Sequence, residues 1–481
     1  MIFIVTELVT DFGYSQNRIV FYREPGYLSW IAAFCYNNAA MKKYYLWTEG
    51  CQMNVADSQR VASALEHLDF ASTTRAEDAD VIVLNTCMVR KSAEDKAVGR
   101  LSSLKTLKQE NPNLVINVMG CMVGVKPRKD LYERFPYVDV FSSPSDPRPL
   151  LSHLLQSLGK STEEIETAQR FAWLDGDIRL PVSEQGQTVS AYLPIMDGCS
   201  HACAYCIIPS RRGGEQSRPA EHIITEAQAL ALQGVKEITL LGQIVDRYGL
   251  DQQGYPSLAG LLRRLHGVEG VERIRFLTSH PNSMTDELLH AVAELPKVMP
   301  HIEVPVQAGD DEVLANMRRG YTADEYRRLI TKIRTIIPDV SFGNDIIVGF
   351  PGETDGQFQH TYDLMKELML DVMHLARYSP RQGTVSATQM VDDVSEEEKW
   401  RRFRLMEELQ EEISTEIHER LLDTTTEVLF EELHKGRWKG RNPNNHLVFV
   451  ESDENLRGQL RRVNIRWAGP WSLVGELADP A

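Results

Sequence analysis

Short apolar runs alternate with amphipathic segments in the part of the chain that follows Lys43. Three such runs predict strands, at residues 44–47, 81–84 and 115–119. The segments between them, from about residue 54 to 68 and up to about residue 107, carry apolar residues at helical spacing among charged ones. Buried strands that alternate with helices are typical of an open parallel sheet. We therefore expect an α/β domain over residues 41–160.

The same alternation resumes at residue 189 and continues to residue 422. Apolar runs predict six more strands, at residues 192–196, 237–241, 273–277, 301–304, 341–348 and 371–376. Repeated strand–helix units over this length predict a partial or complete (β/α) barrel. A stretch rich in Pro, Ser, Gln and acidic residues precedes it, with one helix near residues 150–158 and a linker over residues 161–188.

The period changes once more near the carboxyl end of the chain. A highly charged helix is expected over residues 392–420. From Thr424 onward, short alternating segments predict strands at residues 427–430, 446–450 and 461–466. Short strands of this kind predict a small all-β barrel over residues 423–480. The length of 481 residues agrees with several domains.

The composition is that of an ordinary folded protein, with 42% hydrophobic and 25% charged residues. Because the formal net charge is −16, a nucleic-acid partner would need a local basic patch. The apolar runs are all shorter than a bilayer span. Residues 1–40 show no clear period and lack the basic start of a signal peptide. We expect them to be an extension outside the natural protein, with Met41 as its start and no function for Cys35.

Three cysteines are grouped on one short segment, Cys199-Ser-His-Ala-Cys203-Ala-Tyr-Cys206. Thiolates select zinc or iron–sulfur clusters. A structural zinc site needs four closed ligands, whereas three cysteines leave one iron of a four-iron cluster open to a substrate or cofactor. The spacing therefore favours a catalytic cluster. A zinc site completed by His201 or by a distant ligand is the alternative.

Three further cysteines each follow a predicted strand of the first domain, namely Cys51, Cys87 and Cys121. Ligands gather at the carboxyl edge of an open parallel sheet, so we expect these residues to converge as a second cluster site. The alternative is three inert core thiols, since buried cysteine is common as a small hydrophobe. The seven cysteines of the chain are an odd number without a disulfide-dense pattern, which indicates a reducing compartment.

Polar residues follow the predicted strands of the second domain, notably Gln243, Ser279, His280 and Gln307. The functional face of a barrel lies at these ends, so they are candidate cofactor and substrate contacts. Each could instead be a satisfied polar residue at a strand end. The Gly349-Phe-Pro-Gly-Glu-Thr354 turn also has two interpretations, a tight turn before a helix or an anion site.

A basic segment that contains an aromatic residue lies between the strands of the third domain. Its members are Lys435, Arg437, Trp438, Lys439 and Arg441. Basic side chains interleaved with an aromatic ring fit phosphate contact and base stacking on RNA. The alternative is a solvated basic face.

The grouped cysteines, with Tyr205 before the last of them, resemble the signature of the radical S-adenosylmethionine enzymes. The resemblance implies a 4Fe–4S cluster whose open iron binds S-adenosylmethionine and whose reduced form cleaves it to a 5′-deoxyadenosyl radical. The cluster ligands would be Cys199, Cys203 and Cys206. The candidate cofactor contacts would be Tyr205, Gln243, Ser279 and Gln307.

With both cysteine sets in view, the chain after Met41 resembles the radical S-adenosylmethionine methylthiotransferases. The segments Thr48-Glu-Gly-Cys51-Gln-Met-Asn54 and Asn85-Thr-Cys87-Met-Val-Arg90 are most similar to the members that act on N6-dimethylallyladenosine in tRNA. The resemblance implies a Rossmann-like amino-terminal domain, a radical S-adenosylmethionine partial barrel and a TRAM RNA-binding barrel. An auxiliary 4Fe–4S cluster would be held by Cys51, Cys87 and Cys121. The departures from the family pattern are Ile244, Asp246 and Ala308, where asparagines and a serine are expected.

What the resemblance implies is a transferase that inserts a methylthio group at C2 of a prenylated adenine beside the anticodon, using two S-adenosylmethionine molecules. A C–H bond of an adenine ring has no useful acidity, so acid–base catalysis cannot open it and a radical is needed. The implied partners are tRNA, an electron donor and a sulfur donor, for a cytoplasmic monomer that needs no membrane. Two alternatives remain open, a methylthiotransferase for threonylcarbamoyladenosine and a non-catalytic RNA-binding metalloprotein.

Overall fold

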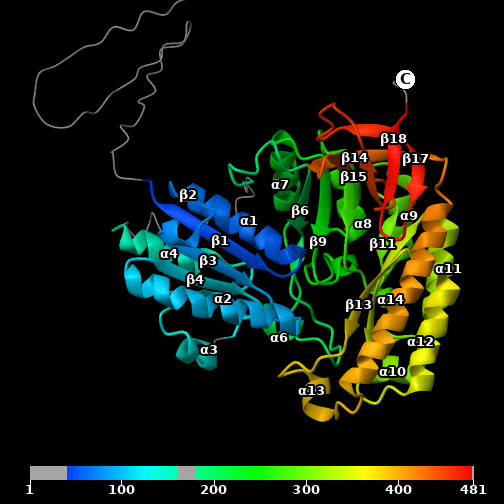
Figure 1. The fold of residues 1–481 in the computed structure, drawn as a ribbon, viewed down its shortest axis with the longest axis horizontal. Helices are drawn as coiled ribbons and strands as arrows, with labels where there is room; N and C mark the ends of the chain where they lie inside the picture. Colours follow the sequence, from blue (N-terminus) through cyan, green and yellow to red (C-terminus); the bar gives the residue numbers. More distant parts are fainter. Residues whose placement is uncertain (1–40, 127, 160–179, 479–481) are drawn as a thin grey trace, which may run out of the picture. The chain divides into compact units, whose positions relative to one another are not determined.

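The computed structural model describes residues 41–126, 128–159 and 180–478 (Figure 1). From Lys43 onward the chain forms one unit, in which a parallel sheet, a partial barrel and a small closed barrel follow one another. The expected α/β class is therefore confirmed. The predictions about residues 1–40, about Cys35 and about most of the linker at 161–188 lie outside the described residues.

Five parallel strands form the amino-terminal sheet, in the order β2-β1-β3-β4-β5. They are β1 (Lys43–Glu49), β2 (Ala71–Ser72), β3 (Val81–Thr86), β4 (Val115–Gly120) and β5 (Val140–Ser142). Every residue of β3 is buried, because helices cover both faces of the sheet. One face carries α1 (Gln52–Glu66) and α4 (Arg148–Ser157), and the other carries α2 (Lys91–Glu110) and α3 (Lys129–Arg134). A 3-10 turn spans Ala76–Asp78.

Six parallel strands form the second part of the fold. They are β6 (Ser190–Pro194), β9 (Glu237–Leu241), β10 (Arg273–Phe276), β11 (His301–Glu303), β12 (Ser341–Val348) and β13 (Val372–Arg377). The sheets β10-β9-β6 and β11-β12-β13 meet where the Ser279 amide donates to the Glu303 carbonyl at 3.3 Å. In the described chain β6 pairs only with β9 and β13 only with β12, so the barrel is partial rather than complete.

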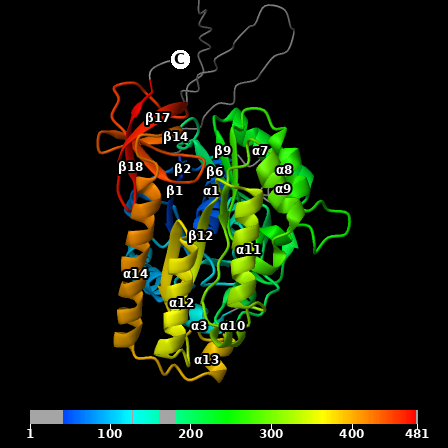
Figure 2. The same cartoon turned by 90° about the vertical axis from the view of Figure 1, so that its right-hand side faces the viewer.

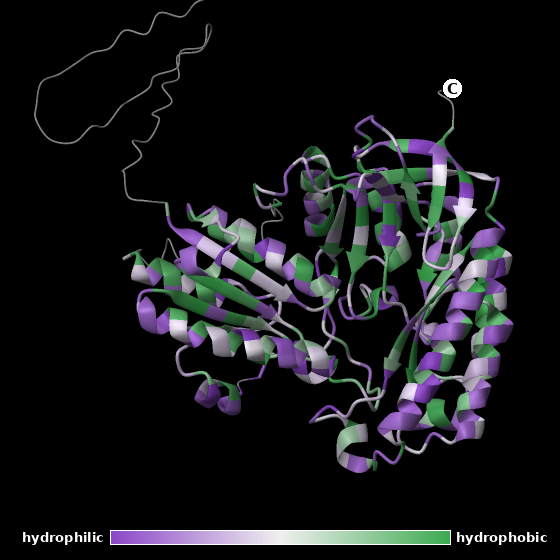
Figure 3. Ribbon diagram, in the orientation of Figure 1, coloured by the Kyte–Doolittle hydropathy of each residue, from purple (hydrophilic) through white to green (hydrophobic). Residues whose placement is uncertain are grey.

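Helices cover the outside of the partial barrel. The longer ones are α7 (Ala220–Leu232), α8 (Leu258–His266), α9 (Asp286–Glu294), α11 (Ala323–Ile336), α12 (Asp355–Leu368) and α14 (Glu396–Glu419). Capping boxes at Thr322 and Thr354 start α11 and α12. Figure 2 shows α11, α12 and α14 side by side along one flank, and Figure 3 shows hydrophobic residues gathered on the strands that these helices cover.

Short elements make up the loops at the strand ends of the partial barrel. They are β7 (Met196–Asp197), α6 (Ile208–Arg212), β8 (Gln216–Ser217), η2 (Val245–Arg247), η3 (Pro281–Ser283), α10 (Asp311–Asn316) and α13 (Val385–Gln389). β7 pairs antiparallel with β8 and closes the base of the cysteine loop that lies between them.

Five strands close into a small barrel at the carboxyl end, in the order β14-β15-β16-β18-β17. They are β14 (Thr425–His434), β15 (Arg437–Arg441), β16 (Leu447–Val450), β17 (Leu460–Ala468) and β18 (Leu473–Leu477). The all-β barrel is thus confirmed, with one correction. The basic segment was expected to connect strands, whereas most of it forms β15 itself.

Two buried arginines of β10 attach the small barrel to the partial barrel. Arg273 Nη1 donates to the carbonyl of Arg441 at 2.7 Å, and Arg275 donates to the carbonyls of Asn442 and Pro443 at 2.8 and 2.9 Å. Glu237 accepts from Arg275 Nε at 3.0 Å, and both side chains are buried. This attachment lies at the amino ends of the strands, so it leaves the carboxyl ends to the cysteine loops.

Helix α1 packs against the opposite ends of the same strands. Met53 and Ala56 of α1 form an apolar cluster with Leu241, the last residue of β9. Because Cys51 is the N-cap of α1, this contact brings the cysteine edge of the first sheet to the carboxyl ends of the barrel strands.

Candidate active site

Three turns at the carboxyl edge of the first sheet carry Cys51, Cys87 and Cys121. Cys51 is exposed at the start of α1, whereas Cys87 and Cys121 are buried directly after β3 and β4. Gly120 has φ +95°, and a Cβ there would lie 2.4 Å from the Thr86 carbonyl. Only glycine fits this turn, which lets the Cys121 amide donate to that carbonyl at 2.9 Å.

Two asparagines hold the first two of these turns together. Asn54 Nδ2 donates to Asn85 Oδ1 at 2.8 Å, and Asn85 Nδ2 donates to the Asn54 carbonyl at 2.8 Å. Asn54 Oδ1 also accepts from the Cys51 amide at 3.3 Å. Both asparagines are fully buried, so this pair fixes the spacing of the Cys51 and Cys87 turns.

The second cysteine set lies on the loop between β7 and α6. The Cys199 amide donates to the Gly213 carbonyl at 3.0 Å, and the Cys206 amide donates to the Cys203 carbonyl at 3.1 Å. The His201 amide donates to Cys199 Sγ at 3.4 Å, and Arg319 Nη1 donates to Cys203 Sγ at 3.4 Å. Two of the three sulfurs therefore already accept the hydrogen bonds that a thiolate prefers.

Burial changes the acidity of the thiols in both sets. It raises the pKa of Cys121 and of Cys206 to about 12, although Arg212 lowers the first value and Arg319 lowers the second. It also raises the pKa of Cys87 and Cys199. Thiols of this kind stay protonated at neutral pH unless a cationic metal centre stabilises the thiolate. This donor set, with its nearby cations, fits an iron–sulfur cluster in each place.

Both cysteine sets border one apolar cluster. Cys121 and Cys199 pack in it with Met88, Ile208 and Ile244, and Cys206 packs against it. Ile244 is one of the departures from the family pattern, and here its side chain packs in this cluster. The cluster thus brings together residues from Met88 to Ile244, which lie more than 150 positions apart in the sequence.

Within the described ranges, no group of three or more His, Cys, Asp or Glu side chains converges as a single metal ion requires. A zinc ion needs four ligand atoms about 2.3 Å or less from one point. The His201 ring lies 4.5 Å from the His280 ring.

The tentative cofactor contacts lie at the carboxyl ends of the barrel strands, as the sequence predicts for a barrel. Ser279 is buried and its Oγ has no partner in the described chain. Gln307 is buried with φ +77°, and its backbone bridges to β12. Gln243 is half-buried after β9, and Tyr205 packs against the barrel core.

Asp246 and His280 form a contact beside Ser279 that the sequence did not predict. The His280 amide donates to Asp246 Oδ2 at 3.0 Å, which leaves Asp246 Oδ1 without a partner in the described chain. His280 Nδ1 accepts from the Asn282 amide, so the proton of the neutral ring sits on Nε2, which also lacks a partner there. Burial raises the pKa of Asp246 to about 7 and lowers that of His280 to about 3. Three orphaned polar atoms beside the cysteine loop suit a polar ligand.

Arg319 is the residue that sequence reasoning missed most clearly. Besides its contact with Cys203, Nε donates to the Tyr321 hydroxyl at 2.8 Å and Nη2 to the Pro305 carbonyl at 2.9 Å. The side chain is thus fixed with one nitrogen aimed at the cysteine loop. Nothing in the local sequence separates it from Arg318, because only the fold shows which of the two points inward.

Arg212 links the two cysteine sets through a buried ion pair. Its guanidinium donates to Asp57 Oδ2 at 3.1 Å and to Asp197 Oδ1 at 3.0 Å, and the Arg212 and Asp57 side chains are fully buried. The guanidinium also lies beside Cys121 and lowers the pKa of that thiol. Asp57 thus belongs to the contact between the sheet and the barrel.

The tentative RNA contacts separate into two groups on β15. Arg437, Lys439 and Arg441 point away from the barrel interior, and Lys435 is exposed in the preceding turn. Arg437 pairs with Glu451 at 2.9 Å and Lys439 with Glu432 at 2.8 Å. Trp438 is buried in the barrel core, so the prediction that its ring stacks on bases is wrong. Exposed tryptophans do occur on this barrel, at Trp467 and Trp471.

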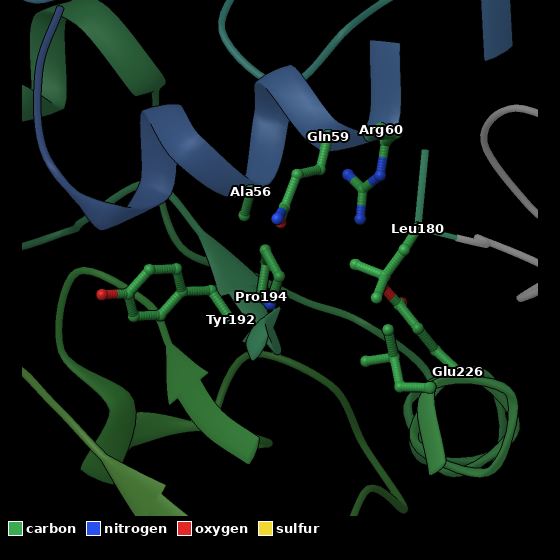
Figure 4. A pocket seen from close by; sticks show the side chains of 8 residues that line it. Ala56, Gln59, Arg60, Leu180, Tyr192, Pro194 and Glu226 are labelled. Carbon is green, nitrogen blue, oxygen red and sulfur yellow. The ribbon is translucent and has the colours of Figure 1, made fainter. Parts of the chain in front are cut away.

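A cavity of about 20 Å³ lies between α1, β6 and α7 (Figure 4). Gln59 and Arg60 point toward it from α1, opposite Tyr192 and Glu226. A volume of this size holds no more than a water molecule. It therefore belongs to the packing of the sheet on the barrel and not to a ligand site.

Comparisons with known proteins agree with this geometry. The family described as Radical SAM superfamily matches residues 193–365, and Uncharacterized protein family UPF0004 matches residues 43–143. A tRNA-2-methylthio-N(6)-dimethylallyladenosine synthase from Roseiflexus sp. (strain RS-1) is 46% identical over 441 residues, 91% of this chain and 90% of that one. Its counterpart from Herpetosiphon aurantiacus is 45% identical and covers 90% of this chain and 97% of its own. The chain belongs to this synthase family.

The resemblance seen in the sequence is thereby confirmed. Membership of the radical SAM superfamily implies S-adenosylmethionine and a 4Fe–4S cluster. Among solved structures, the radical S-adenosylmethionine methyltransferase TsrM from Kitasatospora setae aligns with a TM-score of 0.54 at 16% identity, over 72% of this chain and 77% of that one. At this identity the likeness supports the fold alone. No helix in the described ranges has the length and apolar character of a membrane span.

Proposed function

We propose that the protein methylthiolates C2 of N6-dimethylallyladenosine next to the anticodon of tRNA and consumes two S-adenosylmethionine molecules. The observation that carries the proposal is the single apolar cluster bordered by both cysteine sets. Two catalytic centres that act on one ring carbon must face a common space. The names of the relatives at 45–46% identity support the same substrate.

We assign Cys199, Cys203 and Cys206 to the radical cluster, and Cys51, Cys87 and Cys121 to an auxiliary 4Fe–4S cluster. The first cluster with bound S-adenosylmethionine supplies the one-electron chemistry that opens an unactivated C–H bond. Arg319 orients Cys203, and the Asn54–Asn85 pair orients Cys51 and Cys87. The orphaned atoms of Asp246, Ser279 and His280 bind the polar part of S-adenosylmethionine, with Gln243, Gln307 and Tyr205 as further contacts.

We propose a functional division that follows the sequence: residues 41–160 for the auxiliary cluster, 189–422 for radical chemistry and 423–480 for tRNA. The carboxyl-terminal barrel holds the tRNA through Lys435, Arg437, Lys439 and Arg441, while the target base leaves its stack. The chain works as a cytoplasmic monomer, with a separate electron donor and a sulfur donor. Residues 1–40 take no part in the reaction.

The test is an anaerobic incubation of the reconstituted protein with S-adenosylmethionine, a reductant and a prenylated anticodon stem-loop, followed by nucleoside mass spectrometry. A methylthio mass gain on the prenylated adenosine is expected. Formation of 5′-deoxyadenosine without that gain would keep the radical chemistry and reject the substrate, and the threonylcarbamoyl nucleoside would then be assayed. Absence of both products, with zinc in place of iron, would favour the non-catalytic metalloprotein.

A further inference from the structure

Three ionisable side chains line the inner wall of the partial barrel on neighbouring strands. They are Glu303 on β11, Asp345 on β12 and His374 on β13. Asp345 and His374 are register partners, and Glu303 is the partner of Gly343, two residues before Asp345. Asn344 Nδ2 contacts Met365 Sδ of α12, so the alternate residues Gly343 and Asp345 face the interior instead.

Gly343 makes room for this group. A Cβ at residue 343 would lie 2.6 Å from Glu303 Cγ, so the Glu303 side chain occupies the space that any larger residue would fill. Glu303 Oε2 accepts from the Thr278 amide at 3.3 Å, which fixes the carboxylate. Its other oxygen lies 3.8 Å from His374 Nε2, a charge pair too long for a hydrogen bond.

The group retains unused hydrogen-bonding capacity. Glu303 Oε1, the Asp345 carboxylate and both ring nitrogens of His374 make no hydrogen bond within the described ranges. The His374 side chain is 51% exposed, so a ligand can reach it. The Glu303 carboxylate, against the effect of burial, raises the pKa of His374, with a further contribution from Asp345, while Arg90 lowers it. The imidazole therefore keeps its second proton to a higher pH than an ordinary histidine does, and in either form it has an N–H that can donate.

The position of the group relates it to both cysteine sets. Arg319 donates to Cys203 Sγ at 3.4 Å and to the Pro305 carbonyl at 2.9 Å, and the amide of Gln307, two residues further on, donates to the Asp345 carbonyl at 2.9 Å. Arg90, three residues after Cys87, is close enough to lower the pKa of Asp345. The inner wall at Asp345 thus lies near the cysteine loops of both domains. A base whose ring carbon is attacked between those loops would place another edge against this wall.

We infer that Glu303 and His374 recognise the substituted adenine, Glu303 by accepting its single exocyclic N–H and His374 by donating to ring nitrogen N7. The inference rests on the proposed function. An adenine with one substituent on the exocyclic nitrogen keeps one N–H, and N7 is the neighbouring acceptor. This edge lies across the ring from C2, so C2 faces away from the wall.

Chemical substitution in the RNA tests the inference with the protein unchanged. A prenylated anticodon stem-loop is compared with the same RNA carrying the 7-deaza base, which lacks the N7 acceptor. We expect the wild type to bind the 7-deaza RNA roughly tenfold more weakly, the size of one hydrogen bond to a charged group. His374→Phe should weaken binding of the ordinary RNA by a similar factor and show no further loss with the 7-deaza RNA.

The matched control is His360→Phe, because His360 also pairs with a carboxylate, Asp310 at 2.8 Å, but lies exposed on α12. It should bind both RNAs as the wild type does. Equal wild-type affinity for the two RNAs, or losses that multiply in His374→Phe, would overturn base recognition by His374. Nucleoside mass spectrometry on the same samples reports the methylthio product separately, so the proposed function can stand while this inference fails. A wild type that binds neither RNA overturns both.

A second pair of substrates tests Glu303. An adenine with two substituents on the exocyclic nitrogen has no N–H to donate, and wild-type binding should fall roughly tenfold. Glu303→Gln should bind the ordinary RNA more weakly than the wild type does, by a similar factor. Its affinity for the disubstituted RNA should be little lower than its affinity for the ordinary RNA. If Glu303→Gln weakens both RNAs by the same factor, the carboxylate acts on the fold rather than on the base.

Discussion

Single side chains decide what the two cysteine sets can hold. The thiols lie on tight turns whose geometry comes from neighbours such as Gly120 and Asn54. The sequence singles out all six cysteines as candidate ligands, because their spacing and their places after predicted strands are local features. It did not reveal Arg319 or the Asp246–His280 contact, since those depend on which strand ends meet.

The burial of Trp438 could have been predicted from the alternation of residues along its strand. Along β15 the exposure alternates, and Trp438 shares the inward parity of Gly440, opposite to Arg437, Lys439 and Arg441. The alternation of basic and aromatic residues therefore indicates a strand with one face buried in the barrel core. The RNA-binding interpretation survives for the basic residues only.

Replacing Cys203 with Ala should abolish 5′-deoxyadenosine formation, because the radical cluster loses one of its three ligands. About half of the iron of the wild type should remain, bound by the amino-terminal set. Iron and sulfide analysis with product chromatography measures both quantities. Cys51→Ala is the reciprocal control and should keep 5′-deoxyadenosine while losing the methylthio product. Retained 5′-deoxyadenosine in Cys203→Ala contradicts the assignment.

Asp246 gives the ligand-free protein a dependence on pH. Its pKa is raised from 3.8 to about 7 by burial, so the folded state binds a proton more tightly than the unfolded state between these values. Stability from this group should then fall as pH rises from about 4 to 7. Asp246→Asn should flatten that slope in apparent melting temperatures measured across the range. An unchanged slope would show that Asp246 is ionised throughout.

At the scale of elements, most of the strands that the sequence predicted are long or fully buried, with the three-residue β11 as an exception. β3 begins with a continuous apolar run and β12 extends over eight residues, whereas β2, β5, β7 and β8 have two or three residues each and leave no period to detect. β18 was missed as well, although Leu473 packs in the core of the small barrel. The order of the strands in that barrel depends on pairings between distant segments, which no local pattern contains.

The attachment of the small barrel should depend on Arg275 in particular. Arg275→Met leaves the buried Glu237 carboxylate without its cation and the Pro443 carbonyl without its donor, which should cost about 3–5 kcal/mol. Faster amide hydrogen exchange in β14–β18 and a lower melting temperature are expected. Arg263→Met is the control, because its pair with Glu287 is exposed and should contribute at most about 1 kcal/mol. Equal effects of the two changes would reject the role given to Arg275.

At the scale of the whole molecule, the proposed chemistry depends on holding the first sheet against the partial barrel. The apolar contact of α1 with Leu241 and the buried Arg212–Asp57 pair supply that contact. Composition and periodicity predicted three parts and their classes correctly. They contained no information on how the parts meet, since both partners of each contact look like ordinary core residues or surface charges in sequence.

Coupling between the parts can be measured through Arg212. Arg212→Met should lower stability by about 3–5 kcal/mol, because it leaves Asp57 as an uncompensated buried charge. Adding Asp57→Asn should restore part of this loss, since the unpaired charge is then gone. Thermal unfolding of the two single variants and the double variant measures the difference. A double variant less stable than Arg212→Met would mean that the two residues act independently.

The arginines that hold the small barrel bind main-chain oxygens of residues 441–443, and Ser341 binds that of Asn444 at 2.8 Å. Every amino acid offers the same carbonyl, so these bonds place no demand on the side chains of residues 441–444. The demand falls on Glu427 and His446, whose side chains pair with Arg273 and Asp371 at 3.1 Å each. RNA preference can therefore diverge without disturbing the catalytic half. A barrel taken from a relative and fused at residue 423 should accept the same hydrogen bonds from Arg273, Arg275 and Ser341. The protein is therefore a suitable starting point for chimaeras with altered tRNA choice.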